Sequence, residues 1–155
     1  MVGQTAGSPD DMKEQKETFA DITAEFIGKP YSENGVGPNS YSCVGFCYAF
    51  LKRTGKLTDE SLWTRPDINI ENFMKLRNAN PKETIQLMLK IFSQMGTEVP
   101  INKKIAGDLI IWEENKRFHP GIYVGNGLFI TSYRNIGVRT FPLGDTMRVV
   151  KVRRL

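Results

Sequence analysis

The chain has 155 residues, 40% of them hydrophobic and 25% charged, which is typical of one globular domain and excludes a disordered chain, a collagen and a coiled coil. Its longest apolar run, Cys43–Leu51, is less than half of the roughly 20 residues that a membrane-spanning helix needs. The net charge of +4 equals that of the last ten residues, whose bases are Arg148, Lys151, Arg153 and Arg154. We interpret this segment as a solvated edge strand and expect no nucleic-acid partner.

The N-terminal part is predicted to be a flexible lead-in followed by a helix. Residues 1–9 are rich in Gly, Ser and Thr, and we expect a single domain over residues 10–155. Within it, Asp10–Ile27 has apolar residues at helical spacing and ends before a Gly-Lys-Pro sequence. No signal peptide is visible at the N-terminus, which leaves the compartment open between the cytoplasm and export by a non-standard route to the cell envelope.

A loop and a buried helix come next. Tyr31–Ser42 consists mostly of turn-forming residues, and Ser40 or Ser42 is suited to cap the helix that follows. Cys43–Thr54 is apolar on nearly all sides, which is typical of a helix inside a core.

The segment after this helix is predicted to be an enlarged helical insertion, residues 57–105, within the domain. It contains a short helical stretch at Ile70–Leu76 and a clear helix at Pro81–Gln94, which has proline in its first turn.

From Asp108 onward, the sequence consists mainly of short runs of β-branched and aromatic residues. Five runs are predicted as strands: Leu109–Trp112, Gly121–Val124, Leu128–Thr131, Val138–Phe141 and Arg148–Val152. The Gly-Asn-Gly between the second and third runs is a strong hairpin signal. Helices first and an antiparallel sheet of about five strands second predict an α+β fold.

The two cysteines and the single histidine are too few for a typical zinc site. A disulfide between Cys43 and Cys47 is also disfavoured, because side chains four residues apart on a helix run parallel. We therefore expect neither a metal nor a cofactor.

A thiol nucleophile needs a group that lowers its pKa and a base that accepts its proton. Cys43 lies at the predicted helix N-terminus, where the helix dipole favours a thiolate. His119 is the only histidine, and Pro120 after it favours an extended backbone at a strand start. On the pattern alone, the structural alternatives are favoured: a core cysteine at Cys43, a structural histidine at His119 and a loop aromatic at Tyr31 that covers the core.

Three blocks in order along the chain carry a family resemblance: GKPYSENGVGPNSYSCVGFCYAFLKRTG, AGDLIIW and HPGIYVGNGLFITS. The first resembles a Gly-x-Pro-Tyr lead, a Gly-rich loop and an Asp-Cys-Ser-Gly helix start. The second resembles a Pro-Gly-Asp-Leu strand, and the third a His-Val-Gly-Ile-Tyr strand with its Gly-Asn-Gly turn and Phe-Ile-His-Ala. Over about residues 19–143 the chain resembles the NlpC-type cell-wall peptidases, a bacterial branch of the papain-like cysteine hydrolases.

The resemblance implies a papain-like fold, in which the helix that bears the nucleophile packs on the sheet. It implies Cys43 as nucleophile, His119 as general base and Tyr31 as a residue that lines the substrate pocket. The family's third residue, usually a histidine that orients the base, is Thr131 here, and Ser132 or Asn126 could take its place if the register shifts.

Two further positions match residues that bind substrate in the family. Ser42 and Val44 stand where the family has an aspartate and a serine that help to hold the free amine of a stem peptide. Losing both of these polar groups suggests a substrate with a different end. The resemblance also implies that Gly45 keeps the helix start slim and that Asp108 has a structural role.

The chemistry and the resemblance together predict a cysteine hydrolase that cleaves an amide bond, with peptidoglycan stem peptides as the expected substrate and partner. An acyltransferase with the same Cys43 and His119 is a second hypothesis. A non-catalytic domain that binds a wall or phage component is a third.

Overall fold

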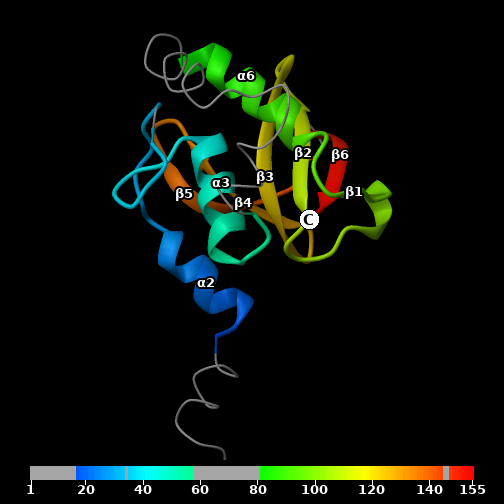
Figure 1. Ribbon diagram of the computed structural model, residues 1–155, viewed down its shortest axis with the longest axis horizontal. Helices are drawn as coiled ribbons and strands as arrows, with labels where there is room; N and C mark the ends of the chain where they lie inside the picture. Colours follow the sequence, from blue (N-terminus) through cyan, green and yellow to red (C-terminus); the bar gives the residue numbers. More distant parts are fainter. Residues whose placement is uncertain (1–16, 34, 58–80, 145–146) are drawn as a thin grey trace, which may run out of the picture.

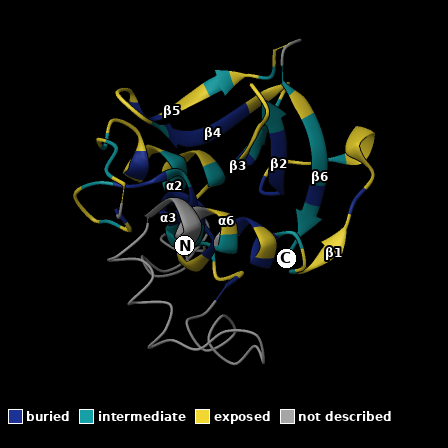
Figure 2. Cartoon of the chain, turned by 90° about the horizontal axis from the view of Figure 1, so that it is seen from above, coloured by how far each residue is buried: buried dark blue, intermediate teal, exposed yellow. Residues whose placement is uncertain are grey.

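A computed structural model describes residues 17–33, 35–57, 81–144 and 147–155. The architecture is α+β, with N-terminal helices packed on a six-stranded antiparallel sheet. Figure 1 shows the helices α3 (Cys43–Arg53) and α6 (Pro81–Phe92) in front of the sheet. Figure 2, viewed from above, shows the strands as a curved row with both helices on one side of it.

The first described helix, α2 (Phe19–Phe26), begins at a capping box. The Thr18 side chain accepts a hydrogen bond from the Asp21 N–H (3.1 Å), and the Asp21 carboxylate accepts one from the Thr18 N–H (3.0 Å). This cap sets the helix start at Phe19 rather than at the predicted Asp10, and residues 10–16 lie outside the described part.

Six strands form the sheet in the order β1-β6-β2-β3-β4-β5, and each pairs with its neighbours antiparallel. Their bounds are β1 (Thr97–Glu98), β2 (Leu109–Glu114), β3 (Arg117–Gly125), β4 (Leu128–Tyr133), β5 (Gly137–Pro142) and β6 (Arg148–Arg154). The predicted hairpin is confirmed between β3 and β4. Its turn needs positive φ angles at all three positions, including 55° at Asn126, which glycine and asparagine tolerate.

Side chains point alternately to the two faces of the sheet along each strand, and both faces carry buried residues. On one face, Ile111, Ile122 and Ile130 share one buried cluster with Phe46 and Phe50 of α3, and we name these residues the helix-side core. On the other face, a second buried cluster forms, which we name the outer core. It consists of Val99, Ile110, Trp112, Phe129 and Val152.

The predicted elements agree with the structure in kind and order, and differ at their ends. The helices α3 and α6 end one and two residues earlier than predicted, and each of the five predicted strands is longer. The sixth strand, β1, has only two residues and no apolar alternation, so no sequence pattern predicts it. A short 3-10 helix, Ile101–Lys103, lies between β1 and β2.

Part of the predicted organisation stays a prediction. The expected short helix at Ile70–Leu76 lies outside the described residues, as do residues 58–80 of the expected insertion at 57–105. The expected lead-in at 1–9 is outside them too, and the single domain over 10–155 stays a prediction. Within the described part of the chain, no helix is long and apolar enough to cross a membrane.

The basic C-terminal strand, β6, was expected at an edge of the sheet, and this expectation is wrong. β6 lies between β1 and β2, and three of its arginines bind carboxylates of neighbouring segments. The pairs are Arg148 with Glu113, Arg153 with Glu98 and Arg154 with Asp108. β6 is therefore an inner strand whose arginines pair with carboxylates of its neighbours.

Candidate functional site

Cys43 is the first residue of α3, directly after its N-cap. The Ser42 hydroxyl accepts a hydrogen bond from the Gly45 N–H (2.9 Å), which fixes the first turn. Cys43 is a free thiol, partly exposed, whereas Cys47 one turn later is fully buried. Only Cys43 is therefore placed to meet a substrate.

The surroundings of Cys43 act on its thiol in opposite directions. Burial raises the pKa of the thiol, and this effect prevails, giving a value of about 11. The backbone N–H groups of Val44 and Cys43 lower it, as expected at a helix N-terminus, and the Arg134 cation lowers it further. At neutral pH the thiol is therefore protonated and surrounded by groups that can stabilise a negative charge.

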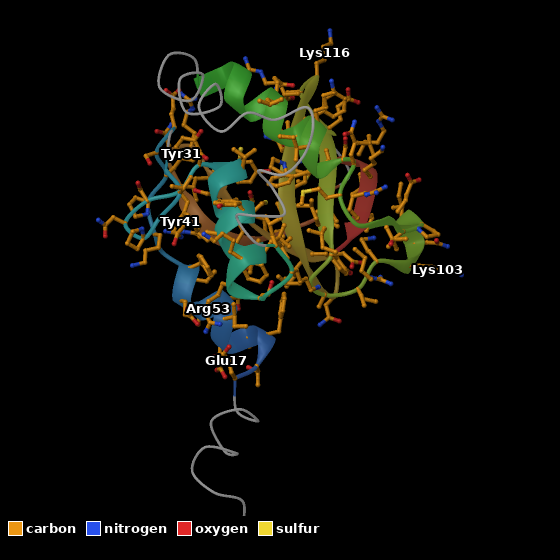
Figure 3. The ribbon with its side chains drawn as sticks, viewed as in Figure 1. Glu17, Tyr31, Tyr41, Arg53, Lys103 and Lys116 are labelled. Carbon is orange, nitrogen blue, oxygen red and sulfur yellow. The ribbon has the colours of Figure 1, made fainter. Side chains whose placement is uncertain are left out.

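The loop before α3 packs closely against the helix start. Gly35 O accepts hydrogen bonds from the Ser42 N–H (2.9 Å) and from the Ser42 hydroxyl (3.3 Å). A Cβ atom at Gly45 would overlap Gly35 O, so that a glycine is required there. This confirms the expectation that Gly45 keeps the helix start slim, and it fixes the loop that carries Tyr31. Figure 3 shows the side chains of Tyr31 and Tyr41 on this loop beside α3.

Tyr31 lies near Cys43 with two charged residues. Burial raises the pKa of its phenol, a negative charge on Cys43 raises it further, and the Arg134 cation opposes both. The Arg134 guanidinium lies over the Tyr31 ring at 5.7 Å from the centroid and binds Glu33 through Nη2 and Oε1 at 2.9 Å. The structure thus brings Tyr31 to the thiol, beside a guanidinium.

His119 lies on β3 and is half-buried. Its imidazole stacks on the Trp112 indole, with centroids 5.7 Å apart and planes at 24°, and it meets the Tyr133 ring edge-on at 6.2 Å. Burial lowers the pKa of His119, the Glu114 carboxylate opposes this, and the Arg117 cation adds to it. The imidazole is therefore neutral at pH 7 and able to accept a proton.

The two predicted catalytic side chains lie in different surroundings. Cys43 packs against the helix-side core, whereas His119 lies beside Trp112 on the outer-core side of the sheet. Within the described residues, no hydrogen bond joins the Cys43 Sγ to the His119 imidazole. Tyr133, at the end of β4, interacts with both: its ring meets His119, and a charge on Cys43 raises the pKa of its phenol.

The third predicted catalytic residue, Thr131, is buried on β4. Its hydroxyl donates a hydrogen bond to Pro120 O (2.8 Å), the carbonyl of the residue after His119. The neighbouring Ser132 hydroxyl donates to Tyr41 O (2.7 Å), which ties β4 to the loop before α3. Asn126 lies in the exposed hairpin turn.

The predicted substrate contacts, Ser42 and Val44, are both buried, with 2% and 6% of their surface exposed. Ser42 uses its hydroxyl for the cap and the loop, as described above. Both residues therefore lie inside the protein at the start of α3.

Three residues of the site were missed by sequence reasoning: Glu114, Tyr133 and Arg134. Tyr133 and Arg134 follow directly on the third sequence block, and Glu114 lies two residues after Trp112 on β2. The missing signal is the strand register, which pairs Trp112 with His119. Among the described residues, no group of three or more His, Cys, Asp or Glu side chains could hold a metal ion.

Residues 28–149 match the NlpC/P60 family. No curated protein matches the chain. Solved structures with the same fold include the NlpC/p60 domain of the peptidoglycan hydrolase SagA, with a TM-score of 0.55 and 21% identity, covering 88% of this chain and 95% of that one.

Two longer proteins share the fold. NlpC2 from Trichomonas vaginalis has a TM-score of 0.57 and 20% identity over 97% of this chain. An NlpC/P60 family protein from Bacillus cereus ATCC 10987 has a TM-score of 0.56 and 22% identity over 97% of this chain. The chain spans only 48% and 41% of their lengths. With the family match over most of its length and the papain-like cysteine peptidase fold, the chain belongs to the NlpC/P60 family, whose members are typically peptidoglycan hydrolases.

Proposed function

We propose that this protein is a cysteine hydrolase that cleaves an amide bond in peptidoglycan stem peptides, with Cys43 as nucleophile and His119 as base. The observation that carries the proposal is the free, partly exposed thiol at the start of α3, next to the backbone N–H groups of Cys43 and Val44. Membership of the family supports the choice of peptidoglycan as substrate.

The first half of the proposed reaction forms an acyl-enzyme. His119 takes the thiol proton as the Cys43 sulfur attacks the amide carbonyl carbon, giving a tetrahedral oxyanion and an imidazolium. The Cys43 N–H and a neighbouring donor stabilise the oxyanion. The carbon–nitrogen bond then breaks, and the leaving amine takes the proton from His119.

The second half releases the product. His119 accepts a proton from water as the water oxygen attacks the thioester, and the carbon–sulfur bond breaks. The sulfur leaves as a thiolate that is reprotonated by the imidazolium, and a carboxylic acid is released. Because thiol and imidazole are both neutral at rest, the ion pair forms only during turnover.

Three further roles belong to the same proposal. Thr131, as third residue, holds the Pro120 carbonyl and so fixes the backbone that carries His119, while its oxygen can still accept an imidazole N–H. Tyr31 lines the pocket beside the thiol. Ser42 and Val44 contribute to substrate binding through the shape of the helix start.

The experiment is a digest of purified peptidoglycan, with the released muropeptides identified by mass spectrometry. The wild type and Cys47→Ala are expected to release new peptide ends, and Cys43→Ala is expected to release none. Circular dichroism checks that each variant is folded. Release by folded Cys43→Ala, or equal loss in both cysteine variants, contradicts the proposal.

Binding of a wall component without catalysis is a second candidate, favoured by two observations. The Cys43 thiol has a raised pKa and makes no hydrogen bond with His119 within the described residues. Sedimentation with intact peptidoglycan, without release of peptides by any variant, is the result that this candidate predicts.

A further inference from the structure

Glu114 and His119 lie on the same face of the sheet. In the pairing of β2 with β3, Trp112 is opposite His119 and Glu114 is opposite Arg117. Since side chains alternate along a strand, these four residues share one face, and Glu114 is the diagonal neighbour of His119. Diagonal neighbours on an antiparallel pair are within reach of long side chains.

Tyr133 interacts with both the Glu114 carboxylate and the His119 imidazole. Its hydroxyl donates a hydrogen bond to Glu114 Oε1 (3.3 Å), and its ring packs edge-on against His119. Burial first, and then the negative charge of Glu114, raise the pKa of Tyr133, so that its phenol keeps the proton it donates. Trp112 and Tyr133 thus border the imidazole while the phenol holds the carboxylate.

We propose that Glu114, held by the Tyr133 hydroxyl, is a positioning residue for His119, and that its carboxylate stabilises the imidazolium formed when His119 takes a proton from Cys43. The inference rests on the proposed function and names a residue that the family resemblance does not. During the transfer the proton moves from the Cys43 sulfur to the His119 imidazole, and none passes to Glu114.

The need for such a group follows from the surroundings of the imidazole. Burial against Trp112 disfavours the imidazolium, and Arg117, on the same strand as His119, disfavours it further. Thr131 is uncharged, and its hydroxyl donates its hydrogen bond to Pro120 O. Of the described groups that act on the charge of His119, Glu114 is the one that favours the protonated form.

Titration of His119 by NMR tests the proposal, because it is the only histidine in the chain. The Glu114→Gln variant is expected to lower the midpoint of the imidazole titration by about half a pH unit or more. Tyr133→Phe, which keeps the ring and frees the carboxylate, is expected to lower it less.

Glu113→Gln is the matched control. Glu113 is the adjacent carboxylate on β2, it points to the opposite face of the sheet, and it pairs with Arg148. This variant is expected to leave the midpoint unchanged. Arg117→Gln is an independent variant on the His119 face and is expected to raise the midpoint, even if Glu114→Gln fails to fold.

Two results overturn the proposal: a midpoint unchanged by Glu114→Gln, or shifts of equal size in Glu114→Gln and Glu113→Gln. An Arg117→Gln midpoint that fails to rise also counts against it. The proposed function is tested separately, by the peptidoglycan digest. If Glu114→Gln shifts the midpoint while the wild type releases no peptides, the hydrolase falls and the electrostatic effect of Glu114 on His119 stands. If the wild type hydrolyses and Glu114→Gln keeps the wild-type pH profile of kcat/KM, the positioning role falls and the hydrolase stands.

Discussion

Arg154, on the last strand, binds the carboxylate of Asp108 at the start of β2 through two hydrogen bonds of 2.8 Å, from Nε and Nη2. Asp108 is almost fully buried and also accepts the Ile105 N–H at 2.8 Å. The backbone of Tyr123 binds the same segment, since its N–H donates a hydrogen bond to Asp108 O (2.8 Å). Arg154 of the inner strand β6 thus binds the aspartate of the Gly-Asp-Leu block.

Asp108→Asn is expected to lower the midpoint of thermal unfolding by about 5 °C, because the buried carboxylate loses its charge-assisted hydrogen bonds. Glu113→Gln, which removes an exposed pair with Arg148, is the control and is expected to change the midpoint little. Differential scanning calorimetry measures both. Equal shifts in the two variants would show that the burial of Asp108 does not strengthen its pair with Arg154.

Gly45→Ala is expected to cost about 3 kcal/mol in the free energy of unfolding, because the new Cβ overlaps Gly35 O. Either the start of α3 or the loop that carries Tyr31 has to move. Gly144→Ala is the matched control, since nothing lies within 4 Å of a Cβ at that position. Urea unfolding at pH 7 measures the difference, and a Gly45→Ala protein as stable as Gly144→Ala would contradict the close packing of this loop.

The sequence was sufficient for those parts of the fold that local signals determine. The buried helix at Cys43, its Ser42 cap and the Gly-Asn-Gly hairpin depend on residues within a few positions of one another, and all are confirmed. The family resemblance, which rests on three blocks in fixed order, is confirmed by the family match over residues 28–149.

The parts that were missed depend on contacts between distant segments. The position of β6 between β1 and β2 follows from pairing across at least 35 residues, and the two-residue β1 has no pattern of its own. The role of Tyr133 follows from register: only the pairing of strands brings it to His119, Glu114 and the region of Cys43. A helix N-terminus alone predicts a thiolate at Cys43, and the burial that reverses this comes from the folded core.

Stability at low pH is expected to depend on His119. Its pKa in the folded protein lies below the ordinary value of 6.5, because burial disfavours the charged form. As the pH falls through and below 6.5, the unfolded chain binds a proton that the folded protein resists, and stability decreases. His119→Gln is expected to lose less stability than the wild type between pH 7 and pH 5, measured by urea unfolding. An equal loss in both proteins would assign the acid sensitivity to carboxylates.

The pH dependence of alkylation reports directly on the state of the Cys43 thiol. Burial raises its pKa from 9.0 to about 11, so that the thiolate is a minor species at neutral pH. Because the thiolate is the nucleophile, the rate of reaction with iodoacetamide is expected to rise about tenfold per pH unit from pH 7 to pH 10, without a plateau. Cys43→Ala provides the control, since the fully buried Cys47 is expected to stay unreacted in the folded protein.

The alternative result has an equally definite meaning. A plateau that begins near pH 6 or 7 would show a thiolate already present at rest, which requires a standing ion pair with the His119 imidazolium. Such an ion pair would contradict the raised pKa of Cys43 and the lowered pKa of His119. Folding stability gives a second check of the pKa of Cys43. The contribution of Cys43 to the free energy of unfolding is complete below pH 9. It decreases as the pH rises towards 11, because the unfolded chain then releases a proton that the folded protein keeps. Cys43→Ala is expected to remove this part of the loss at high pH.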